Sequence, residues 1–226
     1  LIFRGVAFEF RWRTVRAKPA WDFAFFAGSV VAAFSQGVIL GAVLQGIRIS
    51  GRGYAGGWFD WLSPFSVLCG VSVVVGYGLL GATWLNMKTD GEIQARARAL
   101  AWWFAAGTLV AIVAVSAATP TLATAYYRRW FAWPGILVTA QVPLLVTIDA
   151  VLLFLSLRAR KDYWPFFLAL ALFGLSFVGL AISVFPYAIP PTLTLWRAAS
   201  PPQSQLFMLV GAAVLIPIIL AYTSYA

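Results

Sequence analysis

The stretch YWPFFLALALFGLSFVGLAISVF, residues 163–185, contains no charged side chain from its first residue to its last. About 20 consecutive apolar residues are enough for a helix to cross the roughly 30 Å hydrocarbon core of a bilayer. A helix that is apolar on every side belongs in lipid or in a membrane bundle, because it has no face to offer to water. The stretch therefore predicts a membrane span.

The composition of the whole chain agrees with this interpretation. Of 226 residues, 62% are hydrophobic and 10% are charged, against about 25% charged in a soluble domain. A β-barrel is excluded, because its strands are short and alternating, and the runs here are long and continuous. We predict an all-α polytopic membrane protein, a single membrane-embedded domain of antiparallel helix bundles over residues 1–226. The predicted spans are 21–47, 64–87, 100–118, 131–157, 163–185 and 205–222.

The net charge is +9. In a membrane protein such a charge comes from basic residues in the loops between spans and does not indicate a nucleic-acid site. One side of the predicted topology is richer in Lys and Arg, and the positive-inside rule places that side in the cytoplasm. Its basic residues are Arg4, Arg11, Arg13, Arg16, Lys18, Lys88, Arg96, Arg98, Arg158, Arg160 and Lys161. The opposite side has Arg48, Arg52, Arg128, Arg129 and Arg197.

The chain has no histidine and a single cysteine, Cys69. A histidine-ligated haem, a His/Cys zinc site or an iron–sulfur cluster therefore cannot be built from this chain alone. If the protein takes part in redox chemistry, a partner must hold the metal. The apolar start of the chain resembles the end of an earlier helix, so we interpret the sequence as a fragment.

Charged residues inside or beside the spans are the candidate functional residues, because burying them in lipid is costly. Arg4 could hold a propionate or carboxylate, or could anchor to a lipid phosphate. Glu9 could pair with Arg11 or Arg13. Asp149 lies nine residues before Arg158 and so about 13 Å from the basic end, where it could relay protons or form a hydrogen bond to a neighbouring helix.

Three further candidates lie at predicted span starts. Asp22 is expected to cap the first span, at a helix N-terminus. Trp58 and Asp60 belong to the loop GGWFDWLSPF, residues 56–65. Asp60 is the expected N-cap of the second span, with Pro64 in its first turn. We identify no catalytic residue and no metal ligand.

Four stretches of the chain together resemble subunit II of the cytochrome bd-type quinol oxidases, including the cyanide-insensitive branch. They are LIFRGVAFEFR, GWFDWLSPFSVLCG, LLGATWLNMKTDGEIQARAR, and FPYAIPPTLTLWRAASPPQSQL with PIILAYTSY, which begin at residues 1, 57, 79, 185 and 217. They occur in the family's order and extend over nearly the whole chain. The resemblance implies eight helices in a full-length member, with this chain beginning at the end of the second.

The resemblance also implies a function. Such oxidases take electrons from membrane quinol and reduce oxygen to water, and their b and d haems lie in subunit I. Subunit II is then the partner of that haem-bearing subunit, in contact with membrane lipid and quinol. In some members it holds a structural quinone, and a small accessory subunit can be present. Arg4 and Glu9 match a family arginine and acidic residue, which suggests a place for Arg4 at the subunit interface, near haem propionates. The alternatives are a multi-span secondary transporter and a membrane scaffold or assembly subunit.

Overall fold

Six long helices form the framework of the protein. The computed structural model describes residues 2–14, 16–50 and 53–225, and within these ranges the side chains of Phe3, Arg4 and Ile49 are not described. Six helical segments are long and apolar enough to cross a membrane, as the sequence predicts. They are α2 (Lys18–Gln45), α3 (Pro64–Lys88), α4 (Gly91–Leu122), α6–α7 (Ile136–Arg158), α8 (Trp164–Val184) and α10 (Pro202–Tyr225).

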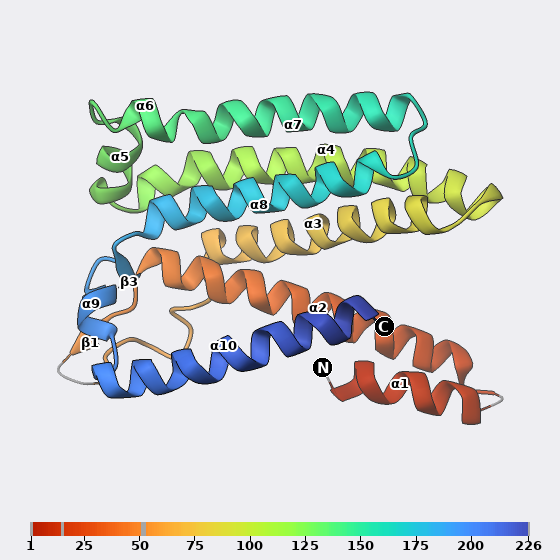
Figure 1. The fold of residues 1–226 in the computed structure, drawn as a ribbon, viewed down its shortest axis with the longest axis horizontal. Helices are drawn as coiled ribbons and strands as arrows, with labels where there is room; N and C mark the ends of the chain where they lie inside the picture. Colours follow the sequence, from red (N-terminus) through yellow and green to blue (C-terminus); the bar gives the residue numbers. More distant parts are fainter. Residues whose placement is uncertain (1, 15, 51–52, 226) are drawn as a thin grey trace.

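The long helices run side by side along one axis, with their connections gathered at two ends (Figure 1). α3 lies between α2 and α4, and α8 packs on both α7 and α3. A short helix, α1 (Ile2–Arg13), folds back against α2. The α1–α2, α3–α4 and α7–α8 turns lie at one end, which we call the basic end.

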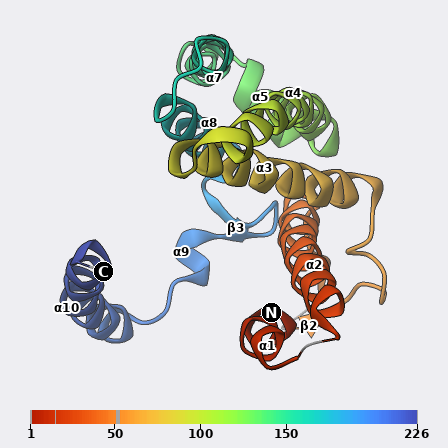
Figure 2. The same cartoon turned by 90° about the vertical axis from the view of Figure 1, so that its right-hand side faces the viewer.

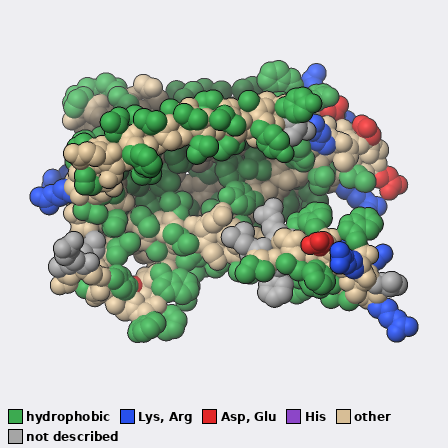
Figure 3. Space-filling view, turned by 60° about the horizontal axis from the view of Figure 1, so that its bottom comes forward, with side chains coloured by type: hydrophobic (Ala, Val, Ile, Leu, Met, Phe, Trp, Pro, Cys, Tyr) green, Lys and Arg blue, Asp and Glu red, His purple; other side chains and the backbone are tan. Residues whose placement is uncertain are grey.

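The opposite end holds the short elements. It contains the antiparallel pair β1 (Ile49–Ser50) and β2 (Gly53–Tyr54) and the pair β3 (Tyr187–Ile189) and β4 (Leu193–Thr194). It also contains α5 (Thr124–Phe131), α6 (Ile136–Thr139) and α9 (Leu195–Ala198), while α7 is Gln141–Arg158. Lys and Arg lie towards the two ends of the face in Figure 3, and apolar side chains cover the length between them.

Two predicted helix caps are wrong. α3 is capped by Ser63, not by Asp60: the Ser63 hydroxyl accepts from the Ser66 N–H, and the Ser66 hydroxyl accepts from the Ser63 N–H. This reciprocal pair satisfies two N–H groups that the first turn leaves without helical partners. α2 begins at Lys18 after Ala17, so Asp22 lies beyond the first turn and cannot cap it.

The predicted fourth span, 131–157, differs most from the structure. Residues 132–135 form turns between α5 and α6, and the apolar helix begins at Ile136. Pro143 has no N–H to donate to the carbonyl of Thr139, and the helix is interrupted at Ala140, which separates α6 from α7. α4 is longer than the predicted 100–118 because its polar first turns, from Gly91, are helical too.

Small residues allow the central helices to approach closely. Gly37 and Gly41 of α2 face Ser66, Cys69 and Gly70 of α3 at backbone distance. On the other side of α3, Leu79 belongs to a fully buried cluster with alanines and leucines of α4, α7 and α8. The members of this cluster with no exposed surface are Leu79, Ala101, Ala105, Leu153, Ala169 and Leu172. Lipid chains are as apolar as leucine, so close packing of this kind replaces the hydrophobic drive of a soluble core.

α10 stands apart from the other helices and is joined to them through β3, β4 and α9 (Figure 2). None of its most apolar window is buried within the described part of the chain. Its apolar side chains point in every direction, as expected of a helix in a wholly apolar environment.

The close approach at Gly37 generates a prediction. A Cβ at Gly37 would lie 2.7 Å from the Cα of Gly70 and closer still to the Cys69 carbonyl oxygen, and this backbone cannot move aside cheaply. Gly37→Ala should destabilise the protein by about 1–3 kcal/mol through overpacking. Gly81→Ala is the matched control, because nothing lies within 4 Å of its new Cβ. Thermal unfolding of the detergent-solubilised protein compares the two, and equal midpoints would contradict the packing argument.

Candidate functional site

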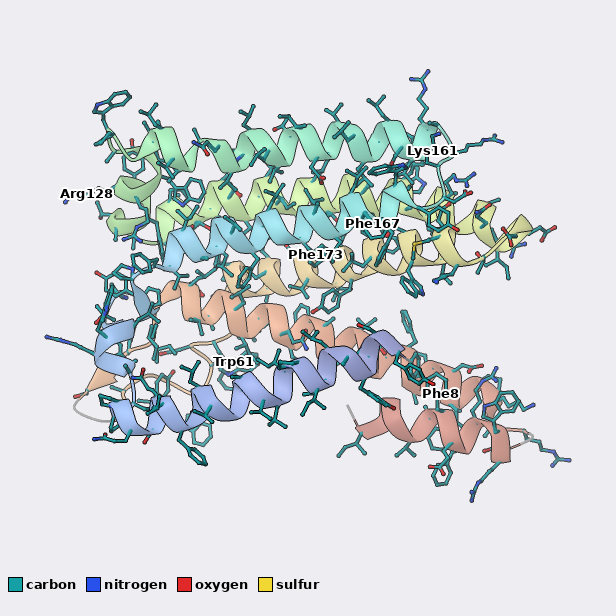
Figure 4. The ribbon with its side chains drawn as sticks, viewed as in Figure 1. Phe8, Trp61, Arg128, Lys161, Phe167 and Phe173 are labelled. Carbon is teal, nitrogen blue, oxygen red and sulfur yellow. The ribbon has the colours of Figure 1, made fainter. Side chains whose placement is uncertain are left out.

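A buried polar network joins two turns at the basic end. Its centre is Asn86, near the end of α3, whose side chain has no exposed surface. The Asn86 amide donates to the carbonyls of Lys161 at 3.1 Å and Asp162 at 3.0 Å, in the α7–α8 turn. Figure 4 labels Lys161 at this end of the molecule. The amide therefore ties α3 to a turn formed much later in the chain.

α4 supplies the rest of this network. Arg98 donates from Nε to the Asn86 side-chain oxygen at 3.0 Å, and from NH2 to the Asp162 carboxylate at 3.1 Å. Gln94 donates to the Asn86 carbonyl at 3.0 Å and to the same carboxylate at 3.1 Å. Charge-assisted bonds of this kind are stronger than bonds between neutral groups, although the Asp162 carboxylate is half exposed to solvent. We call Asn86, Gln94, Arg98 and Asp162 the basic-end network.

Sequence reasoning missed this network as a unit. The signal was an amide within an apolar span and an acidic residue at the end of the basic run Arg158–Lys161. The turn itself is tight, and Arg160 has a positive φ of 53°, which is uncommon for a residue other than glycine. The network fixes where three spans sit relative to one another at this end.

A second polar contact holds α1 against α2. Arg11 forms a two-point ion pair with Asp22, and this contact raises the pKa of Arg11. Phe8 of α1 meets Phe25 of α2 edge-on at 5.3 Å between ring centroids, and Figure 4 labels Phe8 on this hairpin. The arginine at position 11 thus has its acidic partner on the next helix.

The predicted pair between Glu9 and Arg11 or Arg13 is absent from the ion pairs of the described residues. Residues two apart on a helix do not face each other, which accounts for Arg11. Glu9 is exposed instead. Arg4 lies in α1, but its side chain is outside the described residues, so its predicted role stays a prediction.

The loop before α3 is folded around Asp60. Its carboxylate accepts from the Gly57 N–H at 2.9 Å, and the Tyr54 hydroxyl donates to the Gly57 carbonyl at 2.9 Å. The Trp61 ring nitrogen donates to the carbonyl of Trp58, whose own side chain is 93% exposed. Trp58, Asp60 and Trp61 line an open cavity of about 870 Å³ beside the end of α2. Exposed tryptophans at a span end are typical of the membrane–water interface.

Hydrogen bonds near the C-terminal ends of α2 and α8 hold the bundle together at the end opposite the basic end. The buried Tyr126 hydroxyl of α5 donates to the Leu44 carbonyl of α2 at 2.8 Å. Burial raises the pKa of this hydroxyl, which therefore stays a donor at physiological pH. The Trp130 ring nitrogen donates to the Ser183 hydroxyl of α8 at 2.9 Å. Together these bonds tie α5 to both α2 and α8.

Asp149 is a buried acidic residue in the apolar part of α7. Its side chain is 7% exposed, and Oδ2 has no hydrogen-bond partner within the described part of the chain. It lies one turn before Leu153 and two before Leu157, on the α7 stripe that joins the central apolar cluster. A buried carboxyl that lacks a partner is costly and is usually kept for function.

The described residues contain no group of three His, Cys, Asp or Glu side chains that could hold a metal ion. The polar groups described above are the basic-end network, the Arg11–Asp22 ion pair, the loop around Asp60, the hydrogen bonds to helix ends, and Asp149 in the apolar interior. This arrangement can position helices and can exchange a proton at Asp149, and it contains no nucleophile–base pair.

Comparisons with known proteins place this geometry in context. Residues 1–226 match the family described as cytochrome bd terminal oxidase subunit II. The chain is 30% identical to cytochrome bd-I ubiquinol oxidase subunit 2 of Escherichia coli (strain K12), covering all of this chain and 69% of that protein. It is 29% identical to cytochrome bd ubiquinol oxidase subunit 2 of Bacillus subtilis (strain 168), covering 97% and 66%.

A solved structure supports the fold. The structure of bd oxidase from Geobacillus thermodenitrificans superposes with a TM-score of 0.75 at 18% identity, covering 97% of this chain and 67% of that one. At this identity the likeness concerns the arrangement of the helices.

The basic-end network generates a second prediction. Asn86→Leu removes the amide that donates to the α7–α8 turn. It leaves the Lys161 and Asp162 carbonyls and the Arg98 Nε–H without the Asn86 side chain as partner, while Arg98 keeps its bond to the Asp162 carboxylate. The expected loss is about 1–3 kcal/mol or more for each unsatisfied buried group, seen as a lower thermal midpoint in detergent. Glu92→Gln is the control at the same end, because its 3.5 Å contact with Arg96 is fully exposed and such pairs contribute little. An unchanged midpoint for Asn86→Leu would show that the network does not hold the turns together.

Proposed function

The chain belongs to the cytochrome bd terminal oxidase subunit II family, and from this membership we propose that it packs beside a haem-bearing subunit I in a complex that oxidises quinol and reduces oxygen to water. The observation that carries the proposal is the match along residues 1–226 together with the 30% identity to a ubiquinol oxidase subunit.

The residue types of the chain support the proposal that subunit I, and not this chain, ligates the haems. Axial haem ligands in proteins are mostly histidine, with cysteine, methionine or tyrosine in some classes. The chain has no histidine, and Cys69 is buried where α3 meets Gly41 of α2. The absence of histidine, the commonest axial ligand, supports placing the b and d haems in the partner. The role of this chain is to bind that partner and to shape its surroundings.

The α1–α2 hairpin is the proposed contact with subunit I. One face of α1 packs on α2 through Phe8, Phe10 and Arg11. The rest of α1 presents large apolar side chains, with Ile2 82% and Trp12 78% exposed. Apolar rings interleaved with arginines suit an interface that also holds anionic groups. Arg4 and Glu9 are the residues of α1 that the family resemblance assigns to this surface.

The orientation in the membrane follows from the same charges. The three basic connections lie at one end of the bundle (Figure 1), and we place this end in the cytoplasm of a bacterial inner membrane by the positive-inside rule. Oxygen reduction consumes protons as well as electrons. Asp149, in the middle of the apolar core, is our candidate for passing protons through this subunit.

Co-purification tests the proposed function. When the full-length subunit is tagged and co-expressed with subunit I, the pure complex should show b and d haem absorbance and quinol-dependent oxygen uptake. Arg4→Leu should lower the haem content, whereas Arg13→Leu, an exposed arginine on the same helix, should not. Colourless protein that transports a solute would contradict the oxidase assignment. Unchanged haem spectra in Arg4→Leu would contradict only the proposed role of Arg4 and would leave the oxidase assignment standing.

The proton proposal has its own test in the same complex. Asp149→Asn keeps the shape of the side chain but removes its titratable proton. Oxygen uptake should fall by about tenfold or more, in the range of a lost acid–base group, with haem content unchanged. Asp149→Glu should restore activity and shift its pH profile. Full activity in Asp149→Asn would instead assign Asp149 to hydrogen bonding within the bundle.

A further inference from the structure

A long apolar groove runs between α4 and α7, away from the α1–α2 hairpin. Its volume is about 500 Å³, which lies within the roughly 300–1,000 Å³ typical of small-molecule sites. The walls are apolar except for Thr147 and Arg158. Val113 on α4 and Val151 on α7 are 67% and 53% exposed, so the groove opens sideways from the bundle. A molecule could therefore enter it from the surrounding lipid.

The length of the groove matches one leaflet of a bilayer. On α4 the lining extends from Trp102 to Val113, and on α7 from Val146 to Arg158. Eleven residues of helix rise about 16 Å, close to half of the roughly 30 Å hydrocarbon core. Trp102 on α4 and Arg158 on α7 therefore lie at the same end of the groove.

The groove has a charged mouth. Arg158, which lines this mouth, is exposed and forms no ion pair with the described residues. Near this mouth, Trp102 of α4 contacts Phe154 of α7 with ring centroids 5.0 Å apart, and both side chains line the groove. An arginine beside a tryptophan at a span end suits a lipid headgroup, because guanidinium pairs with phosphate and the indole lies at headgroup depth.

We propose that the α4–α7 groove is a binding site for one anionic phospholipid, with its phosphate on Arg158 and one acyl chain between the helices. The charge complementarity at the mouth favours this occupant, since a phosphate forms a charge-assisted hydrogen bond with Arg158 and an uncharged headgroup accepts only a weaker one. The bound lipid fills the gap that α7 leaves towards α4 and stabilises the spacing of these two helices.

Lipid retention by the purified complex tests the site. Delipidated complex is titrated with phosphatidylglycerol or phosphatidylcholine, and bound lipid is counted by native mass spectrometry. One phosphatidylglycerol should be retained in preference to phosphatidylcholine. Arg158→Gln should weaken its retention about fivefold, as expected for one cation near a lipid phosphate. Arg160→Gln is the matched control, because Arg160 lies two residues away and does not line the groove.

A second pair of variants tests the acyl-chain position. Val151→Trp should fill the groove and displace the lipid, whereas Leu152→Trp, on a neighbouring exposed position outside the groove, should not. Haem content reports that each variant is folded. Equal losses in the two arginine variants, retention that survives Val151→Trp, or a quinone in place of the phospholipid would each overturn the proposal.

Discussion

The buried amide of Asn86 is the contact on which the arrangement of the spans depends. Apolar side chains that leave lipid for a protein interface gain no hydrophobic free energy, so packing and polar contacts must hold a membrane bundle together. Asn86 takes its partners from the α7–α8 turn, 75 and 76 residues along the chain, and receives Arg98 from α4. It therefore fixes three spans at one end, while close approach at Gly37 and Gly41 fixes α2 on α3. The opposite end is held by the Tyr126 and Trp130 hydrogen bonds.

The sequence predicts the spans well because the hydrocarbon core dictates their length and composition, and every residue of a span contributes to the signal. It predicts helix starts less well. Both Asp60 and Ser63 are good N-cap residues, and the choice between them depends on Ser66, which completes a capping box with Ser63. The fourth span begins later than predicted, because aromatic residues such as Phe131 and Trp133 suit an interfacial turn as well as a span.

Polar partners are harder to predict, because they depend on which turns meet in space. Asp22 was expected to cap its own helix, yet it pairs with Arg11 across the α1–α2 turn. Asp162 lies at the end of a basic run, where its role is visible only once Arg98 and Gln94 are brought beside it. The sequence singles out Asp149 because the cost of a charge depends on its depth in the membrane rather than on a partner, and the structure buries this residue. Its proposed proton transfer stays a prediction.

The isolation of α10 has a consequence for biogenesis. A helix whose backbone hydrogen bonds are satisfied internally and whose side chains are apolar all round can enter a bilayer without any neighbour. α10 is such an autonomous insertion unit, tethered by the short β3–β4 segment and α9. By this argument α10 can enter the bilayer without first packing on any other described helix.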